Sequence, residues 1–240
     1  WGWLEELSSE KTKNLEDFLG DIRDPACVRE AMKGCDIVFH LAAQPLVRRS
    51  YIDPLGTWAT NVQGSLHLLE ALKPLNHPCA VVMITTDKVY ANREWDYGYR
   101  EEDRLGGNDP YSASKAAAEI IFKAYQESFF NYKKMLGAAT TRAGNVIGGG
   151  DWSEDRIIPD GIKSISKKKS LIIRNPRSTR PWQHVLEPVS GYLILAKKLF
   201  ENPKKFSGSW NFGPLSNETM NVQNIVNLLF KFLKIKKKVS

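Results

Sequence analysis

Short apolar runs alternate with longer amphipathic stretches along the first half of the chain, and this alternation constrains the fold more than any other feature. The pattern predicts buried strands over Asp36–Leu41, Cys79–Ile84 and Ala138–Arg142. Between them, Trp58–Leu72 and Ser112–Phe130 carry apolar residues at helical spacing. Strands that alternate with helices of about ten or more residues form βαβ units and therefore a parallel sheet. We expect an α/β fold that binds its ligand at the carboxyl ends of the strands.

From about Asp151 onward the alternation becomes less regular. The pattern there predicts helices over Ile157–Ile165, Val189–Phe200 and Val222–Leu233, and short strands over Leu171–Ile173 and Ser209–Phe212. Four glycines within Gly144–Asp151 mark a flexible seam between the two parts. We therefore divide the chain into residues 1–150 and a smaller α/β lobe over residues 151–240.

The composition excludes several classes of protein. A chain of 240 residues that is 42% hydrophobic and 25% charged is neither disordered nor fibrous. Its three cysteines (Cys27, Cys35 and Cys79) lack CxxC spacing, which favours reduced thiols and a cytoplasmic location. No apolar run approaches the ~18 residues of a membrane-spanning helix, so we expect no membrane contact. The four histidines are too far apart to predict a metal site.

Charge is distributed unevenly along the chain. Residues 163–240 hold 16 Lys and Arg against three Asp and Glu, whereas residues 1–162 hold 18 against 24. A basic part beside an acidic part indicates a phosphate-bearing ligand or nucleic acid. The simpler alternative is a solvated lysine face, since most of the lysines occur in short runs at predicted helix ends or loops.

A Gly-rich turn is missing from the start of the predicted sheet. Dinucleotide-binding folds hold the pyrophosphate on such a turn, between the first strand and the first helix. No GxGxxG precedes Asp36, and Gly148–Gly150 come too late to supply it. Either the chain does not bind a nucleotide, or its first βαβ unit is absent. Because the chain also opens on Trp1 rather than Met, we expect a fragment that binds NAD poorly and is inactive as it stands.

Tyr111 and Lys115 are four residues apart at the start of a predicted helix, which places both side chains on one face. An ammonium group beside a phenol lowers the pKa of the phenol and makes it a usable base. This spacing alone is common on amphipathic helices. Thr86, which follows the strand Cys79–Ile84, adds a hydroxyl that can hold an alcohol while Tyr111 removes its proton.

These three residues, in order with several shorter segments, resemble the extended short-chain dehydrogenase/reductase family. The shorter segments are Gly20–Asp24, His40–Gln44 and Thr60–Gly64. Within that family, a further set is similar to the CDP-glucose 4,6-dehydratase branch: Thr86–Lys88, Asn92–Trp95, Gly98–Glu101 and Arg174–His184. The resemblance implies a Rossmann-like, doubly wound parallel sheet without its first βαβ unit. It makes residues 1–150 a partial NAD-binding domain and residues 151–240 an incomplete nucleotide-sugar lobe.

The resemblance also implies a reaction and roles for residues. CDP-glucose would be oxidised at carbon 4, lose water across carbons 5 and 6, and receive the hydride back at carbon 6, as in bacterial deoxysugar biosynthesis. Thr86 and Tyr111 would act at the 4-hydroxyl, and Lys115 would tune Tyr111 and bind the nicotinamide ribose. Asp87 would protonate the departing hydroxyl, and Lys88 would take the carbon-5 proton.

Contacts with the cofactor, the substrate and a second subunit follow from the same resemblance. The implied NAD contacts, besides Tyr111 and Lys115, are Asp21, Ile22, Leu41, Ala42 and Ala43. Asn145 and Arg180 are the implied contacts with the substrate, because Arg suits bidentate binding of phosphate. A homodimer is expected through the helices Trp58–Leu72 and Ser112–Phe130.

Three alternatives remain open on the sequence alone. The first is another nucleotide-sugar 4,6-dehydratase or a 4-epimerase, although an epimerase has no need of an acid/base pair at Asp87 and Lys88. The second is a non-catalytic protein that kept the fold and lost its cofactor. The third is nucleic-acid binding through the basic part, which we do not expect because its lysines lack interleaved aromatic residues.

Overall fold

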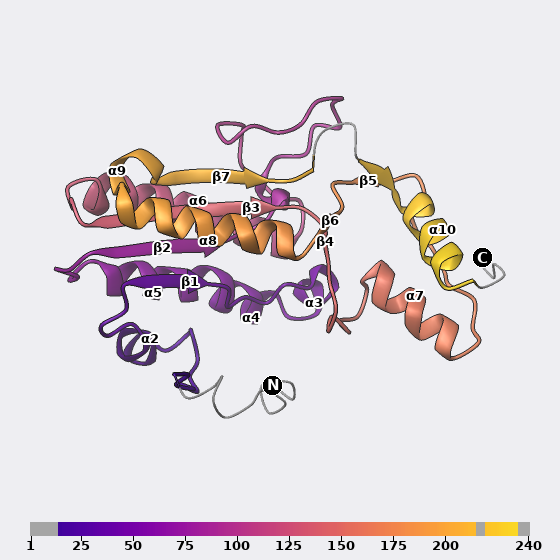
Figure 1. Cartoon of the computed structure of the whole chain (residues 1–240), viewed down its shortest axis with the longest axis horizontal. Coiled ribbons are helices and arrows are strands. Elements are labelled where there is room, and N and C mark those ends of the chain that lie inside the picture. Colours follow the sequence, from indigo (N-terminus) through magenta and orange to yellow (C-terminus); the bar gives the residue numbers. More distant parts are fainter. Residues whose placement is uncertain (1–13, 215–218, 235–240) are drawn as a thin grey trace.

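A four-stranded parallel sheet forms the centre of the computed structural model, which describes residues 14–214 and 219–234 (Figure 1). Its strands are β1 (Ile37–His40), β2 (Cys79–Ile84), β3 (Leu136–Ala143) and β7 (Gly208–Phe212), in that spatial order. Every neighbouring pair is parallel, with Val38 opposite Val81 and Val82 opposite Ala139. The parallel sheet expected from the alternation is confirmed, and its last strand comes from the later part of the chain.

Helices cover both faces of this sheet because its central strands are apolar on both sides. On one face, Val81 and Met83 of β2 pack in a core with α2 (Pro25–Ala31), α5 (Gly64–Leu72) and α6 (Pro110–Tyr125). On the other face, Ala80 and Val82 pack against α8 (Leu186–Glu201) and α9 (Pro203–Phe206). The doubly wound arrangement is therefore confirmed.

The two long helices predicted in the first half begin earlier than their apolar spacing indicates and end in or contain π-helical turns. After α3 (Val47–Ile52), Asp53 accepts a hydrogen bond from Gly56 N at 2.8 Å and starts α4 (Pro54–Trp58). A π-helical turn over Ala59–Gln63 then continues into α5. In the same way, α6 continues into a π-helical turn over Gln126–Phe130.

The later part of the chain divides between the sheet and a smaller unit. α7 (Ile157–Ser166) and α10 (Val222–Phe232) pack around Leu171 (Figure 1). Beside them are two short ladders, β4 (Val146–Ile147) with β6 (Gln183–His184) and β5 (Thr179–Arg180) with β8 (Met220–Asn221). By contrast, α8 and β7 belong to the sheet, although both follow the predicted seam at residue 151.

The predicted strand over Leu171–Ile173 is wrong. Leu171 forms only a single-residue bridge, and the two residues that follow are outside any strand. The apolar character of this segment has another cause: Leu171 is buried between α7 and α10, whereas Ile172 is 75% exposed.

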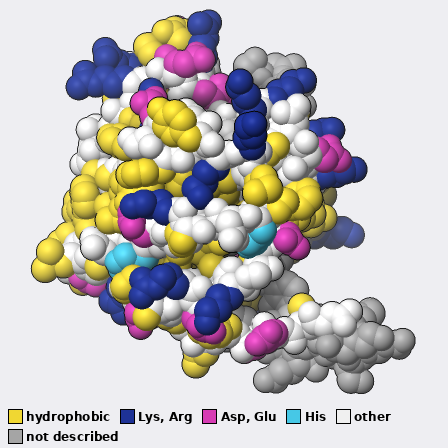
Figure 2. Space-filling model, turned by 90° about the vertical axis from the view of Figure 1, so that its left-hand side faces the viewer, with side chains coloured by type: hydrophobic (Ala, Val, Ile, Leu, Met, Phe, Trp, Pro, Cys, Tyr) yellow, Lys and Arg dark blue, Asp and Glu magenta, His cyan; other side chains and the backbone are white. Residues whose placement is uncertain are grey.

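The surface shows charge of both signs. On the face in Figure 2, hydrophobic side chains are exposed between scattered Lys and Arg side chains, and acidic side chains lie among them. Several exposed lysines are paired with glutamates one helical turn away, as Lys198 is with Glu201. Within the described residues, no helix is both long enough and apolar enough to span a membrane.

Candidate active site

The candidate site lies where β2 ends and α6 begins. Thr85 and Thr86 follow β2, and a 3₁₀ turn over Asp87–Val89 carries the next two side chains. α6 starts at Pro110 because Asp109 accepts hydrogen bonds from the N–H and hydroxyl of Ser112, which satisfies an orphan donor of the helix. This start places Tyr111 in the first turn of α6, at the carboxyl edge of the sheet.

A cleft of about 810 Å³ opens at this edge, between the strand ends and the unit that contains α7. It brings together six residues that the sequence singled out, from segments far apart in the chain: Thr86, Asp87, Lys88, Tyr111, Asn145 and Arg180. Lys115 is buried and lies outside the lining, where its Nζ donates to the carbonyl oxygen of Ile84 at 3.1 Å. A cleft of this volume accommodates a ligand of the size of a nucleotide sugar.

The electrostatic prediction for Tyr111 is wrong. Burial raises the pKa of Tyr111 to about 12, and a hydrogen bond with Thr86 opposes this rise only in part. The main causes of the shift do not include Lys115, whose ammonium group donates to the Ile84 carbonyl at 3.1 Å. Burial also lowers the pKa of Lys115 to about 8. In this structure Tyr111 is therefore a phenol at neutral pH, with its hydroxyl beside Thr86.

Asp87 and Lys88 have pKa values shifted in opposite directions. Burial raises the pKa of the Asp87 carboxyl, against the hydrogen bond that it accepts from Thr86 at 3.2 Å. Burial lowers the pKa of Lys88, and the charges of Arg180 and Arg156 lower it further against the attraction of Asp87. The adjacent pair therefore favours a carboxyl that keeps its proton and an amine that gives its proton up, which suits one acid and one base.

Arg156 was missed by the sequence reasoning, although it lines the cleft. Its Nε has no hydrogen-bond partner and lies 3.4 Å from Oδ2 of Asp151. Its positive charge lowers the pKa values of both Tyr111 and Lys88. The available signal was its position as the N-cap of α7, where a cation opposes the helix dipole and therefore needs another reason to be present.

Two further arginines in the cleft lining are paired with the same carboxylate, that of Asp155. Oδ1 of Asp155 accepts a hydrogen bond from Nη1 of Arg48, on α3, at 2.9 Å and another from Nη2 of Arg174 at 3.2 Å. Arg180, by contrast, is exposed, and its guanidinium donates to the carbonyl of Thr179. Of the arginines in the predicted basic part, Arg174 is therefore held by an ion pair, while Arg180 keeps its charge available to a ligand.

A second cavity, of about 360 Å³, lies beside the end of β1. Its lining includes four of the predicted cofactor contacts, Asp21, Ile22, Leu41 and Ala42, while Ala43 lies outside it. The exposed Asp21 carboxylate has a pKa lowered to about 2 by hydrogen bonds from Arg23. A mainly apolar cavity with one carboxylate at its rim suits a flat aromatic ring that carries an amino group. Among the described residues, no group of three or more His, Cys, Asp or Glu is placed to hold a metal ion.

The chain is similar in sequence to known 4,6-dehydratases. A 52% identical protein, the CDP-glucose 4,6-dehydratase of Salmonella typhimurium (strain LT2), aligns with 89% of this chain over 61% of its own length. The dTDP-D-glucose 4,6-dehydratase of Dictyostelium discoideum is 30% identical over 78% of the chain and 45% of its own length. The chain therefore spans about three fifths or less of the length of these relatives.

Solved structures show the same architecture. DesIV, a dTDP-glucose 4,6-dehydratase from Streptomyces venezuelae with NAD and TYD bound, superposes with a TM-score of 0.78 at 25% identity, covering 92% of this chain and 65% of DesIV. The UDP-glucose 4-epimerase of Thermus thermophilus has the same fold, with a TM-score of 0.78 at 22% identity over 95% of this chain and 73% of its own. The sequence pattern of one family matches residues 3–213, which is most of the chain. The chain therefore belongs to the NAD dependent epimerase/dehydratase family.

Proposed function

We propose that this protein converts CDP-glucose to CDP-4-keto-6-deoxyglucose with NAD as cofactor. The observation that carries the proposal is the pair Asp87 and Lys88, whose pKa values are shifted in opposite directions beside Tyr111 and Thr86. A dehydratase needs such an acid/base pair in addition to the groups that oxidise the alcohol. The 52% identity to the Salmonella CDP-glucose 4,6-dehydratase supports the choice of nucleotide.

The residues beside β1 fit one end of the cofactor. The cavity at Asp21, Ile22 and Leu41 matches an adenine ring in its apolar walls and its rim carboxylate. Lys115 would hold the ribose next to the nicotinamide, and Ala42 and Ala43 would face the linkage between the two nucleosides. Bound NAD would supply the hydride acceptor for carbon 4 and the hydride donor for carbon 6.

Thr86 and Tyr111 act at the 4-hydroxyl of the sugar. The Thr86 hydroxyl holds that oxygen, and the Tyr111 oxygen takes its proton as carbon 4 becomes a ketone. Because burial raises the pKa of Tyr111, the proton transfer requires a nearby positive charge. The charge of Arg156 on the cleft wall favours the ionised phenol and is already part of the value of about 12, so the further positive charge would come from the Lys115 ammonium once it turns toward the nicotinamide ribose.

Asp87 and Lys88 then carry out the elimination. The ketone at carbon 4 acidifies the proton on carbon 5, and the Lys88 amine removes it. The electron pair left behind forms the bond between carbons 5 and 6. The bond between carbon 6 and its hydroxyl breaks, and Asp87 protonates the departing oxygen so that it leaves as water. Each group is already biased toward the required protonation state before substrate binds.

The diphosphate of the substrate would bind on the arginine side of the cleft. Arg180 and Arg156 both line it, and Asn145 adds an amide between them and the strand ends. A guanidinium binds two phosphate oxygens in a fixed geometry, which orients the sugar toward Tyr111. We place the reaction in the cytoplasm, because Cys27, Cys35 and Cys79 are all free thiols.

The test is analysis of the product formed by the purified protein expressed from its complete reading frame. With NAD present, CDP-glucose is expected to yield a 4-keto-6-deoxy sugar, which mass spectrometry detects as the loss of the mass of one water molecule. dTDP-glucose and UDP-glucose are expected to react more slowly. A carbon-4 epimer without loss of mass would support the epimerase alternative, and an absence of any product would support the non-catalytic one.

We also propose that the protein forms a homodimer through α4, α5 and α6. These helices pack side by side, and their outer side exposes apolar residues such as Leu55 (84% exposed) and Ile120 (59% exposed). An Ile120→Asp variant is expected to sediment as a monomer at concentrations where the unchanged protein is a dimer, because a buried charge without a partner destabilises an interface. Ile172→Asp is the control, because it places the same charge at an exposed position outside these helices, in the unit that contains α7 and α10. Equal sedimentation of the Ile120→Asp variant and the unchanged protein would argue against this interface.

A further inference from the structure

A buried ion pair lies behind the cleft. Arg142 of β3 donates from Nη2 to Oε2 of Glu119 on α6 at 2.7 Å, and the two residues are 4% and 2% exposed. Burying two charges is costly, and apolar residues of the same size often give equal stability. The pair therefore needs a role other than holding the fold together.

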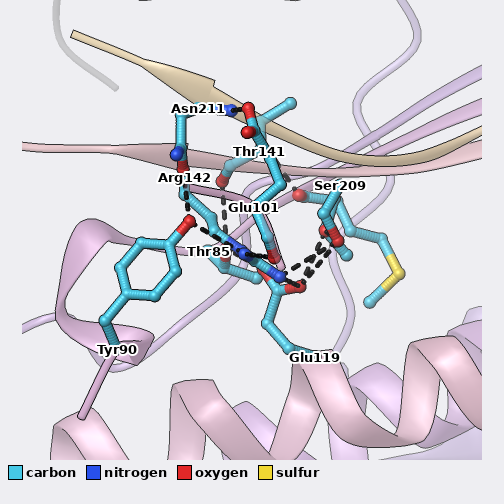
Figure 3. Close-up of polar contacts among 10 residues, drawn as sticks. Thr85, Tyr90, Glu101, Glu119, Thr141, Arg142, Ser209 and Asn211 are labelled. Atoms are coloured by element: carbon cyan, nitrogen blue, oxygen red, sulfur yellow. Dashed lines mark hydrogen bonds and ion pairs between the residues drawn. The ribbon is translucent and has the colours of Figure 1, made fainter. Parts of the chain in front are cut away.

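The Glu119 carboxylate accepts hydrogen bonds from β3, from β7 and from the residue that follows β2 (Figure 3). Thr85, after β2, donates to Oε1 at 2.5 Å, and Thr140 of β3 donates to Oε2 at 2.8 Å. Ser209 of β7 donates to Oε2 at 3.3 Å. One side chain thus connects α6 to β3, to β7 and to the residue that follows β2.

Arg142 extends the same network to the loop that follows the candidate site. Its Nη1 donates to the Tyr90 hydroxyl at 2.8 Å and to the Glu101 carbonyl at 2.9 Å (Figure 3). The Tyr90 hydroxyl in turn donates to Asn211 of β7 at 2.6 Å. The network is therefore one connected set of buried and half-buried contacts that reaches from α6 to β7.

This network adjoins the reacting groups at consecutive residues. Lys115, one turn before Glu119 on α6, donates to the carbonyl of Ile84, and Glu119 accepts from the hydroxyl of Thr85. The next residue is Thr86, whose hydroxyl meets Tyr111 at the start of the same helix. Two buried contacts therefore set how α6, and Tyr111 with it, lies against Thr86.

The same carboxylate acts on the charge of Lys115. Burial lowers the pKa of Lys115 to about 8, and the negative charge of Glu119 raises it against that trend. From β1, the titratable group that faces Lys115 is His40, whose pKa is lowered to about 4, first by burial and then by the Lys115 charge. His40 is therefore neutral at neutral pH and above. This leaves Glu119 as the charge that favours the ammonium form of Lys115.

We propose that Glu119 is a positioning residue for the reaction: it holds Lys115 protonated and keeps α6 in register with Thr86, while Arg142 holds the Glu119 carboxylate in place. The role in the reaction rests on the proposed function. The role in binding the cofactor depends only on Lys115 donating hydrogen bonds to the ribose of NAD.

The test is the pH dependence of NAD affinity in Glu119→Gln, made in the protein expressed from its complete reading frame and measured by calorimetry without sugar substrate. Binding requires the Lys115 ammonium, so affinity falls as pH rises through the pKa of Lys115. Glutamine keeps the shape of the side chain and removes its charge. The midpoint of the fall is expected near pH 8 in the unchanged protein and about one unit lower in Glu119→Gln. We also expect a decrease of about tenfold in kcat, with little change in KM.

Two controls separate this effect from simple destabilisation. Thr140→Val removes a hydrogen bond to Glu119 and leaves the charge of Glu119 unchanged. This variant is expected to lower Tm without moving the midpoint of the fall in NAD affinity. Glu127→Gln removes an exposed carboxylate just beyond α6 and is expected to change neither. If Glu119→Gln does not fold, Glu119→Gln combined with Arg142→Met removes the charge without leaving an unpaired arginine.

The inference is wrong if the midpoint in the folded variant stays within 0.2 units, an interval of roughly 0.3 kcal/mol, of the unchanged protein. It is also wrong if the NAD affinity of the unchanged protein does not fall between about pH 7 and 9. Because no sugar is present, a failure of the proposed dehydratase activity would leave this measurement intact. The two failures are therefore distinguishable.

Discussion

Replacing Tyr111 by phenylalanine is expected to lower kcat with CDP-glucose by about 10²–10⁴-fold, the usual contribution of a positioned acid or base. Phenylalanine keeps the ring in its buried place at the start of α6, and the hydrogen bond from the backbone N–H of residue 111 to Ser50 is unaffected. Only the hydroxyl beside Thr86 is lost, so the proton of the 4-hydroxyl has no acceptor. Affinity for NAD and for CDP-glucose is expected to change by less than about threefold, because binding uses other groups.

The measurement is steady-state product formation, with binding of NAD and CDP-glucose followed separately by calorimetry. Tyr51→Phe is the matched control, since Tyr51 is 63% exposed and lies outside the cleft lining. It makes the same chemical change on a neighbouring helix and is expected to keep full activity. A Tyr111→Phe variant that retains more than about a tenth of the turnover would show that another group takes the proton.

The parallel sheet was predictable because its strands are buried on both faces. β2 consists of apolar residues with little exposure, so its run stands out against the amphipathic helices on either side. β3 is equally buried but contains Thr140, Thr141 and Arg142, which made its signal weaker. Their partners include Glu119 on α6 and Ser209 on β7, and no local pattern in the sequence brings these residues together.

The cleft was predictable in its residues and not in its electrostatics. Motif spacing singled out Thr86, Tyr111 and Lys115, and the structure brings Thr86 and Tyr111 together in the cleft at the strand ends, with Lys115 outside its lining. The pKa of Tyr111, however, depends on how completely the ring is buried and on where the Lys115 ammonium is directed. Both follow from tertiary packing. The same holds for Arg156, which lines the cleft with Tyr111 and Lys88 although it lies far from both in the sequence.

Replacing Lys88 by methionine is expected to stop the elimination and to leave the oxidation at carbon 4 possible. Methionine has about the length of lysine and no proton acceptor, and Tyr111 and Thr86 are unchanged. Turnover is expected to fall by about 10²–10⁴-fold. In D₂O the unchanged protein places solvent deuterium on carbon 5 of its product, because the proton removed by Lys88 exchanges with solvent. Sugar recovered from Lys88→Met is expected to carry no deuterium at carbon 5.

Asp87→Asn separates the two halves of the elimination. The amide cannot protonate the departing hydroxyl, so water loss is expected to fall by a similar factor, while Lys88 continues to remove the carbon-5 proton. Recovered CDP-glucose is then expected to gain deuterium at carbon 5 without losing water. Lys197→Met, an exposed change on α8, is the control and is expected to behave as the unchanged protein. Deuterium at carbon 5 after incubation with Lys88→Met would assign the proton transfer to another group. Exchange lost in both variants would instead mean that Asp87 and Lys88 act together in removing that proton, since neither alone would then suffice.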